Sequence, residues 1–134
     1  MREAITVETD IFEHRKVGPH FINPCCFGED FAAWLKGELS SLEKEGGFNF
    51  SSAIQEDYGW GFWATHGRDR FWIALSYMGD GPQEEPAEWV VSIDLSGSPI
   101  SRLMRRPNHD AFARLRDRTR RALAGNPAIK RVDS

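Results

Sequence analysis

The chain has 134 residues, 40% of them hydrophobic, and this composition fits one folded domain and excludes a disordered chain. No apolar stretch approaches the roughly 20 residues that cross a bilayer, so we expect a cytoplasmic protein with no membrane partner. The net charge of −3 is unevenly divided: residues 1–101 carry 17 acidic and 7 basic side chains, whereas residues 102–134 carry 3 acidic and 10 basic ones. This asymmetry predicts either internal charge pairing or a surface with one acidic and one basic side.

The first third of the chain predicts a strand, a loop and a helix. Residues 3–8 alternate polar and apolar side chains, which indicates a short strand. Residues 9–27 contain two Pro-containing turn signals and indicate a loop, with room for a second strand near Ile11 and Phe12. Residues 29–44 place apolar side chains at helical spacing and carry acids in the first turn, so they predict one helix that ends at Gly46-Gly47.

The middle of the chain predicts an antiparallel meander. A hairpin turn is expected at His66-Gly67-Arg68-Asp69, because Gly67 can adopt a positive φ. Residues 79–86 are rich in Gly, Pro and acids and predict a polar loop. Strands are expected near Phe48 and Phe50, and at residues 58–66, 70–78 and 88–95.

The last third predicts a second helix with clear ends. Asn108 is a candidate N-cap, and Gly125 a candidate C-terminal cap. Residues 100–104 and 128–132 could each add a short strand. The helical stripe expected to face the core consists of Phe112, Leu115, Ala122 and Leu123.

This order of elements predicts a single α+β domain over residues 1–134. We expect a mainly antiparallel sheet of about five strands, with the two helices packed on one face and the other face left for solvent or a partner. The expected core comprises Phe31, Trp34, Leu35, Leu39, Trp60, Phe62, Phe71, Ile73, Trp89, Val91, Ile93, Phe112 and Leu115.

The most informative segment is residues 55–63, Gln-Glu-Asp-Tyr-Gly-Trp-Gly-Phe-Trp, with four aromatic residues within six positions. If the segment is extended, Tyr58, Trp60 and Phe62 anchor the core, and the two glycines and the last Trp face the opposite side. A glycine within a strand indicates a close approach, either by an aromatic ring of a neighbouring strand, which we favour, or by a ligand or partner. The candidate binding surface therefore consists of Glu56, Asp57, Gly59, Gly61, Trp63 and Trp72.

No arrangement of residues predicts a catalytic site, a metal site or a cofactor. Cys25 and Cys26 are adjacent, so they cannot form an ordinary disulfide, and no spacing places His14 or His20 with them as metal ligands. Glu56 and Asp57 point apart in an extended segment and do not form a natural acid–base pair. The Gly59-x-Gly61 spacing lacks the third glycine and the helix start of a phosphate-binding loop.

The C-terminal arginines could bind nucleic acid, but the sequence favours another interpretation. On a helix, Arg114, Arg118 and Arg121 lie on one flank, whereas Arg116 and Arg120 lie on another. This arrangement brackets the apolar stripe instead of forming one recognition face, and the acidic remainder of the chain would repel phosphate. We expect these arginines to pair with acids of the sheet and of the first helix.

The sequence thus favours a non-enzymatic domain that binds a protein, either another protein or a second copy. Aromatic side chains anchor interfaces, and acidic surfaces speed the capture of basic partners. Small bacterial inhibitors of secreted toxins, the immunity proteins, share this general character, although the chain matches none of their motifs. The alternatives are a small-molecule pocket or enzyme site beside Gly59, Gly61 and Trp63, and nucleic-acid binding through the Arg-rich helix.

Overall fold

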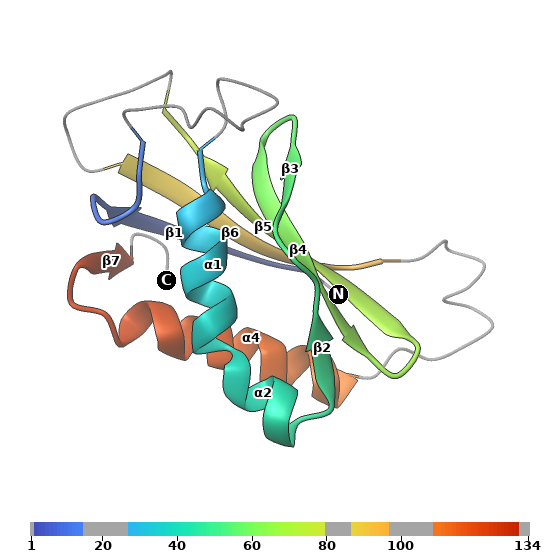
Figure 1. The fold of residues 1–134 in the computed structure, drawn as a ribbon. Helices are drawn as coiled ribbons and strands as arrows, with labels where there is room; N and C mark the ends of the chain where they lie inside the picture. The colour runs from blue at the N-terminus through green and yellow to red at the C-terminus, as the bar shows by residue number, and fades with distance from the viewer. Residues whose placement is uncertain (1, 15–26, 80–86, 97–108, 132–134) are drawn as a thin grey trace.

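The computed structural model of the protein describes residues 2–14, 27–79, 87–96 and 109–131. Within them it is an α+β structure with a curled antiparallel sheet, which confirms the predicted fold class (Figure 1). The strands are β1 (Arg2–Thr9), β2 (Phe48–Phe50), β3 (Ile54–Glu56), β4 (Gly59–His66), β5 (Asp69–Tyr77), β6 (Ala87–Leu95) and β7 (Ile129–Arg131). The helices are α1 (Glu29–Glu38), α2 (Ser40–Glu45) and α4 (His109–Ala124).

The strands run in the order β2-β4-β5-β6-β1-β7, and β3 also pairs with β4. The described sheet therefore has seven strands instead of the expected five or so. Part of the excess arises because the first strand of the predicted meander is divided at residues 51–53 into β2 and β3. Ser51 keeps this edge attached, since its backbone N–H donates to the carbonyl of Trp63 at 2.9 Å and its hydroxyl accepts from the Trp63 N–H at 2.8 Å.

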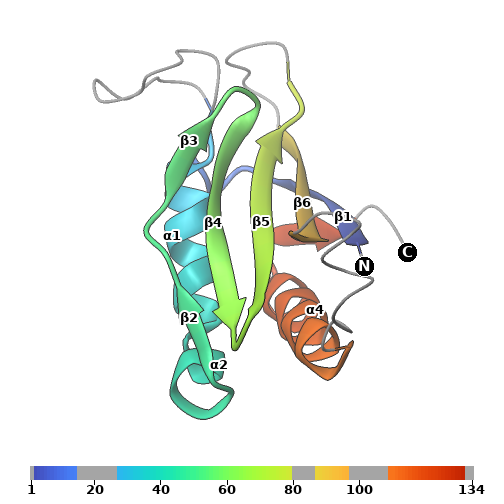
Figure 2. The ribbon, with the colours of Figure 1, turned by 90° about the vertical axis from the view of Figure 1, so that its right-hand side faces the viewer.

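Helices α1 and α4 lie on the same side of the curled sheet, as Figures 1 and 2 show together. The apolar side chains of every second position in β4, β5 and β6 are buried beneath them, so the predicted strand orientations are correct. All predicted core residues are buried except Trp34, which is half-buried and packs against the core. The expected helical stripe of α4 is likewise buried.

The first predicted helix is interrupted at Leu39. Its N–H is shared between the carbonyls of Leu35, at 3.0 Å, and Lys36, at 3.2 Å, which tightens the last turn of α1. Gly37 and Ser40 flank this point, and both residue types have lower helix propensity than alanine. The break lets Leu39 remain fully buried while α2 turns toward β2.

The hairpin between β4 and β5 has the predicted turn. His66 pairs with Asp69, and Gly67 at the first loop position has a φ of 59°, as in a type II′ turn. The chain after β1 bends at residues 10–12 instead of continuing as a strand. The predictions for His20, Cys25, Cys26, Asn108, residues 100–104 and most of the 79–86 loop lie outside the described residues.

Candidate functional site

The face of the sheet opposite α1 and α4 carries the aromatic residues that sequence analysis selected. No helix that the structure describes covers this face, which we call the open face (Figure 2). The residues on this face occupy the positions that alternate with the core positions. In β4, β5 and β6 they are Gly59, Gly61, Trp63, Thr65, Arg70, Trp72, Ala74, Ser76, Glu88, Val90, Ser92 and Asp94.

Trp63 and Trp72 are directly opposite each other on neighbouring strands of the open face. Their ring centroids lie 4.8 Å apart at an interplanar angle of 56°. Both side chains are half-buried, so part of each ring remains in contact with solvent. Aromatic cross-strand pairs of this kind stabilise a sheet and also present a large, rigid apolar area.

Gly61 makes room for the indole of Trp72. A Cβ atom at position 61 would lie 2.8 Å from Cε2 of Trp72 and 2.6 Å from the carbonyl oxygen of Ile73, both too close for a real side chain. The glycine is therefore required because an aromatic ring of the neighbouring strand crosses over it, which is the interpretation that sequence analysis favoured. The space above Gly61 is consequently filled by Trp72.

Gly59, at the start of β4, also allows a close approach of β5. Its φ is 158°, and an added Cβ would clash with the carbonyl oxygen of Leu75 in β5. The backbones of β4 and β5 thus approach each other closely at Gly59 as well as at Gly61.

Arg70 and Tyr58 extend the Trp pair in opposite directions. The guanidinium carbon of Arg70 lies 4.2 Å from the centre of the Trp63 ring, which is a cation–π contact. At the other end, the indole N–H of Trp72 donates to the hydroxyl of Tyr58 at 2.5 Å. These four side chains, Tyr58, Trp63, Arg70 and Trp72, form what we call the aromatic patch.

The expectation that Tyr58 anchors the core is wrong. Glu56 pairs with Gly59, so Asp57 and Tyr58 form the two-residue loop of the β3–β4 hairpin instead of the first positions of β4. The alternation of faces therefore does not extend to Tyr58, which is 47% exposed and bonds to Trp72 on the open face.

The electrostatic environment of the patch is acidic at the Tyr58 end. Partial burial raises the pKa of the Tyr58 hydroxyl above its usual value, the charges of Glu56 and Asp94 raise it further, and the hydrogen bond from Trp72 opposes them. Arg2 forms an ion pair with Asp94 at 3.3 Å, at the β1 side of this region.

The structure therefore brings part of the predicted surface together. Gly61, Trp63 and Trp72 are in contact or in register, whereas Glu56 and Asp57 lie at the exposed end of the β3–β4 hairpin. Sequence analysis did not select Arg70 and Tyr58. Arg70 could have been found because it lies two residues before Trp72 and so shares its face.

Two of the five arginines of α4 follow the predicted pairing with acids of the sheet and of the first helix. Arg120 contacts Glu3 of β1 at 2.6 Å, and Arg118 contacts Glu38 of α1 at 3.8 Å. Arg114 instead donates to the carbonyl oxygen of Gly46 at 3.2 Å and to the Nε2 of His66 at 3.1 Å. The pairs with Glu3 and Glu38 tie α4 to the rest of the fold, which counts against a free basic face for nucleic acid.

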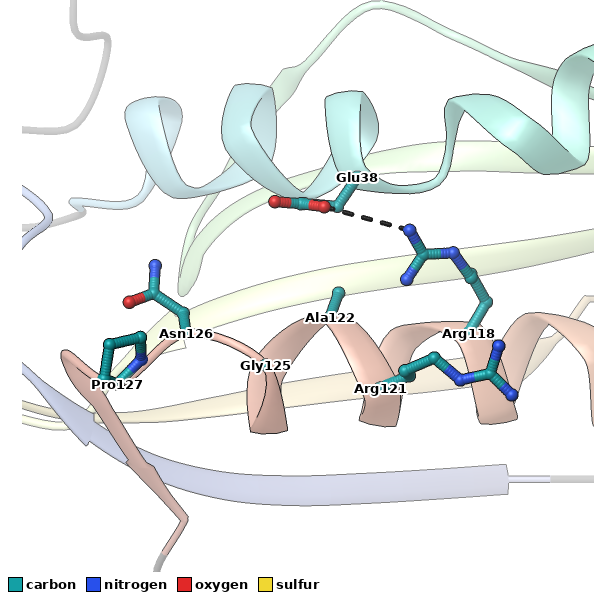
Figure 3. Close-up of a pocket in the computed structure, with 7 residues that line it drawn as sticks. All are labelled: Glu38, Arg118, Arg121, Ala122, Gly125, Asn126 and Pro127. Atoms are coloured by element: carbon teal, nitrogen blue, oxygen red, sulfur yellow. Dashed lines mark ion pairs between the residues drawn. The ribbon is translucent and has the colours of Figure 1, made fainter.

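Two open hollows lie beside α4. The larger, of about 480 Å³, lies between α1 and the C-terminal half of α4; its lining includes Glu38, Arg118 and Asn126 (Figure 3). The smaller, of about 360 Å³, lies between α2 and α4 and includes Ser41, Arg114 and Arg118. These hollows are on the helical side of the sheet, away from the aromatic patch.

A buried histidine lies near the end of β1. The fully buried His14 bonds through Nε2 to the carboxylate of Asp10 at 2.6 Å and stacks on Tyr77, while its Nδ1 has no hydrogen-bond partner among the residues that the structure describes. The described residues contain no group of three or more His, Cys, Asp or Glu side chains placed to hold a metal ion.

Comparisons of the chain with family models, curated proteins and solved structures found no match. Of the helices that the structure describes, none has the length and apolar character needed to cross a membrane.

Proposed function

We propose that this chain is a non-enzymatic interaction domain that binds a basic protein through the aromatic patch on its open face. The observation that carries this proposal is the geometry of the patch. Two half-buried Trp rings lie side by side, Gly61 leaves room for the ring of Trp72, and the ring of Trp63 already has a guanidinium group on its face. Trp, Tyr and Arg are the residue types that most often dominate the energetics of protein interfaces.

The charges around the patch favour a basic partner. Of the charged side chains on the described open face, the acids Glu8, Glu56, Glu88 and Asp94 outnumber the bases Arg2, Arg70 and Lys130 by four to three. The field of two of these acids reaches the patch, since Glu56 and Asp94 raise the pKa of Tyr58. Complementary charge accelerates encounter and selects basic over acidic partners.

The rings themselves also favour positive charge. Arg70 shows that the Trp63 ring accepts a guanidinium at 4.2 Å, and lysine or arginine side chains of a partner would find the same chemistry on Trp72 and Tyr58. Each such contact contributes about 0.5–2 kcal/mol, depending on how far it is desolvated.

A basic toxin or enzyme neutralised by this domain is the kind of partner that fits best, and it makes the protein an inhibitor of the immunity type. The acidic half of the chain, with 17 acidic against 7 basic residues, would match such a partner in sign. We also propose a cytoplasmic location.

The test is affinity capture followed by measurement with the purified partner. We expect Trp63→Ala and Trp72→Ala each to weaken binding at least tenfold, because anchor residues at interface centres contribute about 2 kcal/mol or more. Ile11→Ala is the matched control, since Ile11 is an exposed apolar residue outside the patch. Thermal unfolding of each variant verifies that the fold is kept.

Three outcomes would contradict the proposal: an acidic partner, a partner whose affinity ignores both Trp substitutions, or stable self-association through the same face. Sedimentation of the free protein separates the last case, because loss of the dimer in Trp72→Ala would identify a second copy as the occupant.

A further inference from the structure

The hollow between α2 and α4 is lined by three arginines of one helical stripe. Arg114, Arg118 and Arg121 are spaced by four and three residues, so they lie along the same flank of α4. The hollow has a volume of about 360 Å³, and Ser41 of α2 lines it from the other side. Pockets of at least about 300 Å³ are large enough for a small molecule.

The positive charge of this stripe is only partly neutralised. Arg118 has a long contact of 3.8 Å with Glu38, and Asp117, which also lines the hollow, is engaged by Arg116 at 3.0 Å. Arg121 is exposed and makes no hydrogen bond or ion pair with any residue that the structure describes. Like charges three and four residues apart on a helix repel each other, and a bound anion would relieve that repulsion.

One arginine of the stripe is already held in place. Arg114 donates to the Gly46 carbonyl and to His66, and its guanidinium lies 5.6 Å from the centre of the Phe48 ring. A guanidinium fixed in this way loses little conformational entropy when it binds a ligand, and its remaining N–H groups can donate to oxygen.

The position along α4 also distinguishes the two hollows. The larger hollow lies at the C-terminal end of the helix, beside Gly125 and Asn126, where the helix dipole disfavours anions (Figure 3). The smaller hollow shares Arg118 and Arg121 with the larger one, but it extends back to Arg114, more than two turns before that end, and Glu38 does not line it. An anion therefore fits the α2–α4 hollow better.

We infer that this hollow is a binding site for a phosphate group, carried by a small molecule or free in solution, with Arg118 and Arg121 as the direct ligands and Arg114 as the fixed positive charge beside them. Arginine forks match the geometry of phosphate oxygens, and Ser41 adds a hydroxyl donor at the opposite wall. This site is separate from the aromatic patch and does not rest on the proposed protein-binding function.

The test is calorimetric titration of the full chain with inorganic pyrophosphate at low ionic strength. We expect saturable binding of one pyrophosphate per chain, which weakens as salt is raised because the hollow is open to solvent. Arg121→Ala should weaken binding about tenfold, the loss of one charged hydrogen bond. Glu38→Gln should strengthen it severalfold, because Arg118 then has no competing carboxylate.

The matched control is Arg2→Ala, which removes the same charge from the open face and should leave the affinity within about twofold of wild type. Adenosine monophosphate, a small phosphate ester, should also bind, and Arg121→Ala should weaken its binding about tenfold as well. The inference is overturned if pyrophosphate does not bind saturably, if Arg2→Ala weakens binding as much as Arg121→Ala, or if only a long oligonucleotide binds.

Discussion

At the scale of single residues, the packing of the open face depends on the absence of a side chain at Gly61. Because Gly61 has no Cβ, the indole of Trp72 can lie across β4, where its N–H reaches the hydroxyl of Tyr58. Sequence analysis could predict this use of the glycine from alternation alone. It missed the place of Tyr58, because a turn at Asp57-Tyr58 interrupts the alternation; Gly59, at the last position of this turn, was interpreted as part of the strand.

The first prediction concerns Gly61→Ala. The added methyl group would overlap the Trp72 ring and the Ile73 carbonyl, so we expect a loss of about 1–3 kcal/mol in the free energy of unfolding. The near-ultraviolet circular dichroism of the Trp pair should change as well. Urea unfolding measures the loss in the free energy of unfolding.

Gly37→Ala provides the matched control for that experiment. Gly37 is an exposed helical glycine of α1, and nothing lies within 4 Å of where its Cβ would be. Alanine there should stabilise the protein by about 0.5–1 kcal/mol. Equal effects of the two substitutions would show that Trp72 does not press against Gly61.

The second prediction concerns the ionisation of Tyr58. Burial and the nearby acids raise the pKa of its hydroxyl above 10.0, so the folded protein holds this proton more tightly than the unfolded chain does. Stability should therefore be fully present below pH 10 and fall as the pH rises through the pKa of the folded state. The phenolate absorbance of Tyr77→Phe, in which Tyr58 is the remaining tyrosine of two, measures this pKa.

Glu56→Gln should lower that pKa, because it removes one of the charges that raise it. Titration of Tyr58 at or below pH 10, or no response to Glu56→Gln, would contradict the acidic environment that we assign to the patch.

At the scale of elements, α4 is both a wall of the core and the basic side of the molecule. Its apolar stripe is buried, while Arg120 and Arg118 reach Glu3 of β1 and Glu38 of α1. The periodicity of the sequence predicted both features. It missed the break between α1 and α2, because the apolar positions continue at helical spacing through Leu39, which outweighed the lower helix propensity of Gly37 and Ser40.

The third prediction is that the Arg120–Glu3 pair couples α4 to β1. Both side chains are largely shielded from solvent, 26% and 18% exposed, and their contact is 2.6 Å. A double-mutant cycle with Arg120→Ala and Glu3→Ala should give a coupling of about 1 kcal/mol in the free energy of unfolding.

The exposed Arg116–Asp117 pair should give a coupling of less than about 0.5 kcal/mol in the same cycle. If the cycle for Arg120 and Glu3 also gave less than about 0.5 kcal/mol, this pair would not hold the helix to the sheet.

At the scale of the whole molecule, the charge asymmetry of the sequence is used in two ways. Part of it is neutralised within the molecule by the ion pairs between α4 and the acids of the sheet and of α1, as expected from the sequence. The remainder leaves acids on the open face and partly neutralised positive charge in the hollow beside α2. The sequence could not predict that hollow, because it forms only where the break at Leu39 brings Ser41 opposite the arginine stripe.

The central claim, that the aromatic patch binds a basic protein, is tested most directly by the indole N–H signals of the five Trp residues in NMR spectra during titration with the purified partner. The account predicts that the signals of Trp63 and Trp72 shift and saturate together, while those of the buried Trp60 and Trp89 stay in place. Shifts confined to Trp34 and the amides of α1 and α4, with Trp63 and Trp72 unchanged, would contradict it.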